Sequence, residues 1–234
     1  MTPTESKKPS LRGLLLTEMF LFIFPLLLLG LSGDWRWREG LIFSAWFLLS
    51  SGGTVAYPYF KDPELYAERR RRPKRGEVQA GDRRILLALF VLYLVWFVFI
   101  PLDAVRFHWT PNFPLGLRLL GGIFLLSSTF FIFRSFVDNT FLSSVVRLQE
   151  DRKQQVVSTG VYGIVRHPMY LGMLCSFLGA PLFLGSYVGL VIGLTMGALL
   201  AARIIGEEHL LVDQLEGYAD YRQKVRYRMV PLVW

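Results

Sequence analysis

Apolar residues along the chain gather in six long runs that are separated by polar segments. The runs cover residues 14–31, 41–60, 85–105, 115–137, 169–184 and 187–205. They are apolar on all sides instead of alternating between apolar and polar positions, which favours helices over the strands of a β-barrel. A helix needs about 20 apolar residues to cross the roughly 30 Å hydrocarbon core of a bilayer. The pattern therefore predicts an all-α bundle of about six transmembrane helices.

The fifth and sixth runs are separated only by Gly185 and Ser186. Such a short connection joins antiparallel neighbours, so we expect a tight helical hairpin at 169–205. The composition agrees with a membrane protein, because 53% of the 234 residues are hydrophobic and only 19% are charged. The first run is expected to be a retained span, since no signal-peptide cleavage pattern follows it.

Positive charge is concentrated in the polar segment at 61–84, in a chain whose net charge is +8. Loops rich in lysine and arginine stay in the cytoplasm. Six spans then place both termini, the segment at 138–168 and any site in the C-terminal part on the cytoplasmic side. We interpret the basic run at 69–75 as a topology signal that contacts membrane lipid headgroups, and not as a nucleic-acid surface.

The chain divides into an N-terminal bundle of four spans, residues 1–137, and a C-terminal unit, residues 138–234, whose polar segments frame the hairpin. Within this unit, "GVYGIVRHPMYLG" places Arg166, His167 and Pro168 directly before an apolar run. Pro168 suits a first helical turn, and the exposed N–H groups and helix dipole there favour an anionic ligand group. The alternative is that Arg166 only reaches towards the interface and His167 only caps the helix.

A second cluster, "RIIGEEHLL", ends the last apolar run. Arg203 and Glu207 are four residues apart and share one helical face. A cation inside an apolar run needs a partner or a ligand. Glu207 and Glu208 are expected near a helix C-terminus, where negative charge requires a positive neighbour. The alternative is an Arg203–Glu207 ion pair with Glu208 in solvent.

The C-terminal tail combines Tyr218 and Tyr221 with several basic residues, a composition typical of an interfacial anchor. We expect no nucleic-acid partner, because the tail adjoins the membrane and ends in apolar residues. The sequence contains no P-loop, paired-cysteine pattern or glycine-rich dinucleotide motif. Its three histidines fall in separate segments, so we expect no metal site.

Taken in order, these elements resemble the isoprenylcysteine carboxyl methyltransferase family and its phospholipid methyltransferase relatives. The matching pattern is G-x-Y-x-x-x-R-H-P-x-Y-x-G, an apolar hairpin, R-x-x-x-E-E and Y-x-x-Y, within residues 149–231. The resemblance implies a membrane methyltransferase that uses S-adenosylmethionine and releases S-adenosylhomocysteine. It implies a lipophilic methyl acceptor that enters from the bilayer, with the carboxylate of an isoprenylcysteine-like substrate as the first choice.

The resemblance also implies roles for individual residues. The cofactor contacts would be made by Gly160, Tyr162, Arg166, His167, Pro168, Tyr170, Leu171, Gly172 and Glu208. Arg203 and Glu207 would orient the methyl acceptor, and Tyr218 and Tyr221 would lie on the substrate side. These residue types suit the chemistry, because acids and aromatic rings attract a cationic sulfonium and an arginine can hold a carboxylate.

Three other functions stay open. The first is a methyltransferase with a different acceptor, which is a phospholipid amine, a small thiol or another amphiphile. The second is a membrane sterol reductase that uses a phosphorylated nicotinamide cofactor, which Glu207 and Glu208 disfavour because they would repel its phosphates. The third is a scaffold or transporter, which is disfavoured because the polar residues gather at one interface instead of the membrane midplane.

Overall fold

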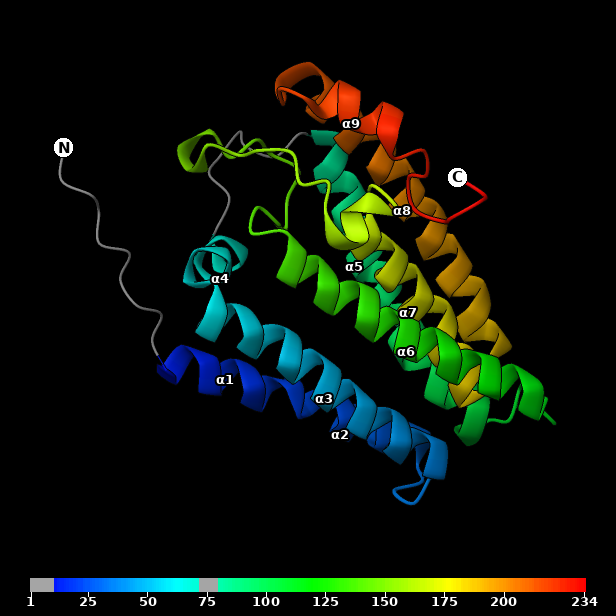
Figure 1. Ribbon diagram of the computed structural model, residues 1–234. Coiled ribbons are helices and arrows are strands. Elements are labelled where there is room, and N and C mark those ends of the chain that lie inside the picture. Colours follow the sequence, from blue (N-terminus) through cyan, green and yellow to red (C-terminus); the bar gives the residue numbers. More distant parts are fainter. Residues whose placement is uncertain (1–10, 72–79) are drawn as a thin grey trace.

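The computed structural model describes residues 11–71 and 80–234. Within these ranges the chain is helical and contains no β-sheet, apart from one parallel β-bridge between Val165 and Tyr227 (Figure 1). The α-helices are α1 (Leu11–Leu21), α2 (Ile23–Ser32), α3 (Arg38–Lys61), α4 (Pro63–Arg70), α5 (Ala80–Pro101), α6 (Leu115–Asp138), α7 (Pro168–Leu184), α8 (Tyr187–Gln214) and α9 (Tyr218–Lys224). The predicted all-α class is confirmed. The part of the predicted basic run at 72–75 lies outside the described residues.

The protein is a multi-pass integral membrane protein. Five helical segments of the described chain are long and apolar enough to cross a membrane: Leu11–Ser32, Arg38–Lys61, Gly81–Arg106, Leu115–Asp138 and Tyr187–Gln214. The sixth predicted span is the apolar helix α7, which has 17 residues and is therefore shorter than the other five. All six predicted runs are helical, although length alone qualifies only five of them as spans.

The first span is not one continuous helix, as the sequence pattern suggested, but consists of α1 and α2. The break follows from Pro25, which has no N–H group to donate to the carbonyl of Leu21. At the break, the N–H of Phe22 donates to the carbonyl of Met19, a bond over three residues instead of four. Another proline, Pro101, ends α5, and a π-helical turn at Leu102–Arg106 follows it directly.

The predicted hairpin between α7 and α8 is confirmed. Gly185 ends α7 in the left-handed region with φ +88°, and its N–H donates to the Pro181 carbonyl at 2.9 Å. The Ser186 hydroxyl caps α8 by accepting the Gly189 N–H at 2.9 Å. Helix α8 then continues to Gln214, nine residues beyond the predicted end of the apolar run at 205.

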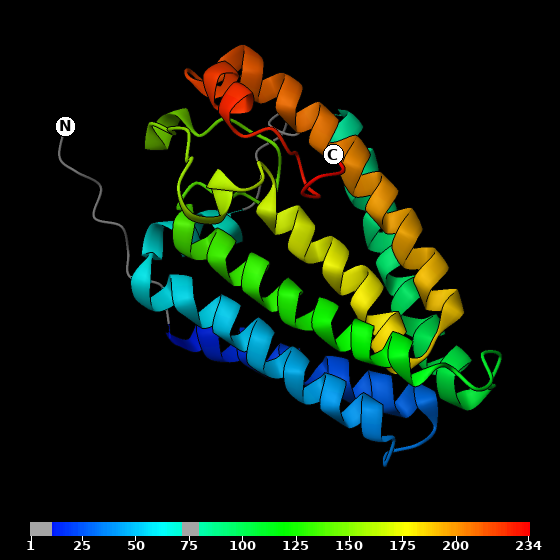
Figure 2. The same ribbon diagram turned by 45° about the vertical axis from the view of Figure 1, so that its right-hand side comes forward.

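Helices α6 and α7 lie between α3 on one side and α8 on the other (Figures 1 and 2). Helix α9, the segment at 139–167 and the C-terminus gather at the same end of this bundle. Close contact between α6 and α7 depends on Gly172, because a Cβ atom there would lie 2.6 Å from Ile132 Cγ1 and 3.2 Å from the Ser128 carbonyl oxygen. The bundle thus holds the start of α7 and the end of α8 beneath the polar segments.

Candidate active site

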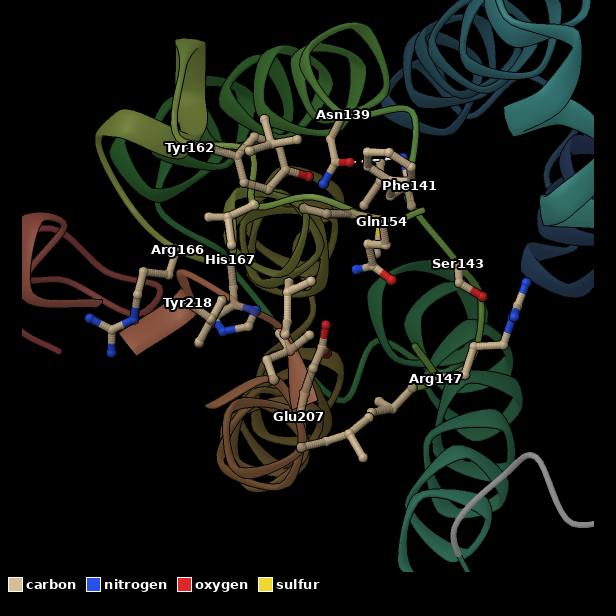
Figure 3. A pocket seen from close by; sticks show the side chains of 18 of the residues that line it. Asn139, Phe141, Ser143, Arg147, Gln154, Tyr162, Arg166, His167, Glu207 and Tyr218 are labelled. Atoms are coloured by element: carbon tan, nitrogen blue, oxygen red, sulfur yellow. Dashed lines mark hydrogen bonds between the residues drawn. The ribbon is translucent and has the colours of Figure 1, made fainter. Parts of the chain in front are cut away.

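A polar pocket lies where the segment at 139–157, the start of α7, the second half of α8 and helix α9 meet. Its empty space amounts to about 840 Å³, including the solvent at its open mouth. Figure 3 shows His167 and Glu207 approaching it from different elements, with Gln154 from the connecting segment above them. We call this space the active-site pocket.

The structure brings most of the predicted site residues to this pocket. Its lining includes Tyr162, Arg166, His167, Pro168, Tyr170, Arg203, Glu207, Tyr218 and Tyr221. Four predicted cofactor residues, Gly160, Leu171, Gly172 and Glu208, do not line it. Of these, Gly172 packs against α6 and Glu208 is buried in an ion cluster.

The start of α7 forms one wall of the pocket. Pro168 is the first helical residue, as predicted, and His167 is the N-cap, although its side chain makes no capping hydrogen bond. The N–H groups of Arg166 and His167 donate to the carbonyls of Tyr227 (3.0 Å) and Arg228 (2.8 Å). The C-terminal segment therefore fixes the approach to α7, while the next N–H groups precede the helical hydrogen-bond ladder and are available to a ligand.

Tyr162 is positioned by a tight turn that begins at Gly160. Gly160 has φ +59°, and a side chain there would collide with the carboxylate of Asp138. That carboxylate accepts the N–H of Val161 at 2.9 Å. Tyr221 from α9 donates its hydroxyl to the Tyr162 carbonyl at 2.7 Å. Gly160 therefore allows the backbone conformation that directs Tyr162 into the pocket.

Tyr170 and Glu207 form the polar centre of the pocket. The Tyr170 hydroxyl donates to Glu207 Oε2 at 2.7 Å, which joins α7 to α8. The Tyr170 ring stacks with the His167 ring at a centroid distance of 5.6 Å. The Arg203 guanidinium carbon lies 5.7 Å from the centroid of the Tyr170 ring. The Glu207 carboxylate has no ion pair among the described residues and faces the pocket (Figure 3).

Glu208 is the centre of a buried ion cluster. Its Oε1 accepts Arg166 Nε at 2.6 Å and its Oε2 accepts Arg228 Nε at 2.8 Å. The Arg166 guanidinium also donates to the carbonyls of Val225 and Arg226, and it points away from the pocket in Figure 3. Glu208 is 2% exposed, so the alternative that placed it in solvent is wrong. In this structure the side chains of Arg166 and Glu208 hold the start of α7 against the C-terminal segment.

Arg203 forms its ion pair with Asp82, and not with Glu207 as the alternative supposed. Its Nε donates to Oδ1 of Asp82 in α5 at 2.8 Å, and its Nη2 donates to the Ser144 carbonyl at 3.1 Å. The Arg203–Glu207 ion pair is therefore wrong as an alternative. The expected helix C-terminus is also wrong, because Glu207 and Glu208 lie inside α8, which ends at Gln214.

Tyr218 is buried at the pocket wall, and its hydroxyl has no hydrogen-bond partner among the described residues. Burial raises the pKa of Tyr218 well above its usual value, and the negative charges of Glu208 and Glu207 act in the same direction. Burial is also the main cause of the raised pKa of Tyr162. Both phenols therefore stay neutral, and the Tyr218 hydroxyl can donate a hydrogen bond to a ligand.

Other lining residues come from the segment at 139–157 and were not predicted. They include Asn139, Arg147 and Gln154 (Figure 3). Arg147 pairs with Glu68 of α4 at 2.7 Å, and the Gln154 side chain accepts the Gln149 N–H at 2.9 Å. The segment has no periodic pattern that would have placed these side chains, because internal hydrogen bonds and α4 determine its path.

The fold and pocket thus describe a membrane-embedded helical protein with a polar site at one end of its bundle. Residues 117–216 match the family model described as phospholipid methyltransferase. This C-terminal part of the chain is similar to that family, which confirms the resemblance inferred from the motifs.

Curated relatives extend this finding. The chain is similar to protein-S-isoprenylcysteine O-methyltransferase B of Arabidopsis thaliana, with 30% identity over 137 residues, 57% of this chain and 65% of that protein. It is similar to the protein-S-isoprenylcysteine O-methyltransferase of Schizosaccharomyces pombe, with 34% identity over 85 residues, 36% of each chain. It is also similar to methanethiol S-methyltransferase of a Pseudomonas species, with 33% identity over 144 residues, 59% of this chain and 54% of that protein. The match covers less than two thirds of the length of each relative.

Proposed function

We propose that the protein is an S-adenosylmethionine-dependent methyltransferase that acts on a lipophilic acceptor at the membrane. The observation that carries this proposal is the active-site pocket, which combines the start of α7 with the Glu207 carboxylate and buried tyrosines in the segment that matches the methyltransferase family. The three relatives also support it, because each is named as a methyltransferase.

The residues of the pocket fit this cofactor. Glu207 offers a negative charge and Tyr170 an aromatic face, which attract a sulfonium cation. The hydroxyl of Tyr218, which has no partner within the described part of the chain, and the N–H groups at the start of α7 suit the polar and carboxylate groups of an amino-acid-containing ligand. When bound, S-adenosylmethionine supplies an electrophilic methyl group. The task of the protein is to position donor and acceptor and to exclude water.

The acceptor is proposed to be the carboxylate of an isoprenylcysteine-like molecule. A carboxylate is already ionised near neutral pH, so the site needs no general base. Two of the relatives are named for this acceptor class. A thiol is the second candidate, because the Pseudomonas relative is named for methanethiol. We further propose that the pocket and both termini face the cytoplasm, as the basic loop predicts.

A labelled transfer assay tests this function. The detergent-purified protein is incubated with methyl-labelled S-adenosylmethionine and, in separate reactions, N-acetyl-S-farnesylcysteine, phosphatidylethanolamine and methanethiol. We expect label in the farnesylcysteine ester and none with Glu207→Ala. Label only in the methylated thioether or in the phospholipid would keep the enzyme class and change the acceptor. Absence of label with all three, together with no binding of S-adenosylhomocysteine, would contradict the proposed function.

A further inference from the structure

One wall of the active-site pocket comes from a segment without regular helices. The segment at 139–157 contributes more lining residues than any helix, among them Asn139, Ser143, Arg147 and Gln154. Apart from one 3-10 turn at Glu150–Arg152, it has no helix of its own. Its position therefore depends on side-chain contacts, and not on the hydrogen-bond ladder of a helix.

Internal hydrogen bonds join the two halves of this segment. The Gln149 side chain donates to the Phe141 carbonyl, and Gln149 is only 1% exposed. Arg152 Nη1 donates to the Thr140 carbonyl at 2.8 Å. The Gln154 side chain accepts the Gln149 N–H at 2.9 Å. A contact that fixes one part of the segment therefore fixes lining residues in both halves.

Glu68 of α4 binds this segment although it does not line the pocket itself. Its Oε1 accepts Arg147 Nε at 3.0 Å and its Oε2 accepts Arg147 Nη2 at 2.7 Å. Such a bidentate pair fixes the orientation of the guanidinium as well as its distance. Oε1 also accepts the Ser143 hydroxyl at 3.2 Å. One carboxylate thus holds two residues of the pocket wall.

This ion pair is buried, unlike the second pair between α4 and the segment. The side chains of Arg147 and Glu68 are 9% and 5% exposed. Hydrogen bonding to Glu68 holds the pKa of Arg147 above its usual value. The second pair, Glu64 with Arg152, spans 3.3 Å, and the Glu64 side chain is 72% exposed. Loss of one partner is therefore expected to matter far more at Glu68 than at Glu64.

Helix α4 gives Glu68 a firm support. The Asp62 side chain caps the helix by accepting the Leu65 N–H at 2.9 Å, and Leu65 is fully buried. The Tyr66 ring contacts the ring of Tyr59 in α3 edge to face, at a centroid distance of 5.4 Å. The position of α4 is thus set by the membrane bundle, and Glu68 passes it on to the segment at 139–157.

The charge of Arg147 is used for this contact and not for a ligand. Its third nitrogen, Nη1, donates to the Leu148 carbonyl and to Asp151, both at 3.3 Å. Each guanidinium nitrogen therefore has an acceptor within the protein. Figure 3 shows the Arg147 guanidinium beside Ser143 and directed away from Glu207. Arg147 thus contributes to the pocket through the position of its segment.

We propose that Glu68 is a positioning residue for methyl transfer, which acts through Arg147 and Ser143 to hold the segment at 139–157 against the active-site pocket. This inference rests on the proposed methyltransferase function. A segment held in one arrangement offers its lining residues to the cofactor and keeps water away from the sulfonium donor. Loss of Glu68 therefore weakens cofactor binding without removing a group that lines the pocket.

Hydrogen exchange tests whether Glu68 holds the segment. The full chain in detergent is compared with Glu68→Gln and with Glu64→Gln, the matched control on the same helix. In Glu68→Gln, amides at 139–157 should exchange at least about tenfold faster, while those of α6, α7 and α8 keep their wild-type rates. Glu64→Gln should exchange as the wild type does. Equally faster exchange in all these helices would show a merely structural role and overturn the proposal.

Isothermal titration with S-adenosylhomocysteine measures the consequence for the site. We expect about tenfold weaker binding in Glu68→Gln and unchanged binding in Glu64→Gln. The double variant Glu68→Arg with Arg147→Glu restores opposite charges and should recover most of the lost affinity. Wild-type affinity in a Glu68→Gln protein overturns the proposal, as does a double variant that folds and binds no better than Glu68→Gln.

A milder substitution keeps the test valid if Glu68→Gln does not fold. Arg147→Lys retains the positive charge beside Glu68 but loses the bidentate geometry. It should speed exchange at 139–157 and weaken S-adenosylhomocysteine binding in the same direction, and an unchanged segment and affinity would overturn the proposal. If the folded wild type binds no S-adenosylhomocysteine, the proposed function fails as well. Binding by the wild type that Glu68→Gln retains in full counts against the role of Glu68 alone.

Discussion

Nε of Arg203 in α8 donates a hydrogen bond to Oδ1 of Asp82 in α5 at a distance of 2.8 Å, and both side chains are buried. The same guanidinium donates to the Ser144 carbonyl, so it also holds the segment at 139–157. One turn further along α8, Glu207 faces the active-site pocket. The ion pair therefore sets the position of α8 relative to the segment at 139–157.

Asp82→Asn should destabilise the protein by about 3 kcal/mol or more, because it leaves the Arg203 cation buried without a counterion. Thermal unfolding in detergent measures this loss. Glu64→Gln is the matched control, since the Glu64 side chain is 72% exposed and its ion pair with Arg152 should contribute less than about 1 kcal/mol. The double variant Asp82→Leu with Arg203→Met should recover much of the loss. Equal stability of Asp82→Asn and Glu64→Gln would contradict this account.

Glu208→Gln should also reduce stability, because Arg166 and Arg228 both donate to its carboxylate. Glu216→Gln, at an exposed position, should not. We expect a lower unfolding temperature, with any loss of cofactor affinity following from a displaced C-terminal segment. If the variant keeps the wild-type unfolding temperature and loses S-adenosylhomocysteine binding, Glu208 contacts the cofactor directly, as the family resemblance implied.

Gly172→Ala tests whether Gly172 is needed for the packing of α7 against α6 or for contact with the cofactor. The new Cβ atom would lie 2.6 Å from Ile132 Cγ1 in α6, so α6 and α7 must move apart. We expect a loss of about 1–3 kcal/mol, typical of overpacking. Gly206→Ala has open space around its Cβ and should stabilise α8 by up to about 1 kcal/mol. Chemical denaturation of both variants checks the difference, and a neutral Gly172→Ala would show that the helices are not in close contact there.

Stability should fall at alkaline pH because the pocket tyrosines resist ionisation. Burial raises the pKa of Tyr218 above its usual value. Above pH of about 10, the unfolded chain loses a phenolic proton that the folded protein keeps, so stability decreases by up to about 1.4 kcal/mol per pH unit for each such tyrosine. Below that pH, this group makes no pH-dependent contribution. Unfolding temperatures measured from pH 8 to 11 should fall less steeply for Tyr218→Phe, and an unchanged slope would refute the explanation.

The sequence pattern predicted the helical runs well because each apolar run must be buried in lipid or protein. It also predicted the start of α7, since Pro168 lacks an N–H group and suits the first turn. The break at Phe22 and the length of α8 were missed. The break depends on a proline within the run, and the final turns of α8 are polar on their exposed side and therefore do not continue the apolar pattern.

The motifs predicted part of the lining of the candidate site, but not the contacts that hold this lining in place. Tyr170, His167 and Glu207 meet at the pocket as the motifs suggested. The Arg203–Asp82 pair joins residues 121 positions apart, and no local spacing indicates such a contact. Glu68 had no predicted role, because only the fold shows that it binds Arg147, 79 positions further along the chain.

Isothermal titration of the detergent-purified protein with S-adenosylhomocysteine tests the central claim most directly. The account predicts saturable binding at one site, at least tenfold weaker in Glu207→Ala and in Tyr218→Ala, and unchanged in Gly53→Phe, which lies outside the active-site pocket. No saturable binding by the folded wild type would contradict the methyltransferase assignment. Equal affinity in all four proteins would place the cofactor somewhere other than this pocket.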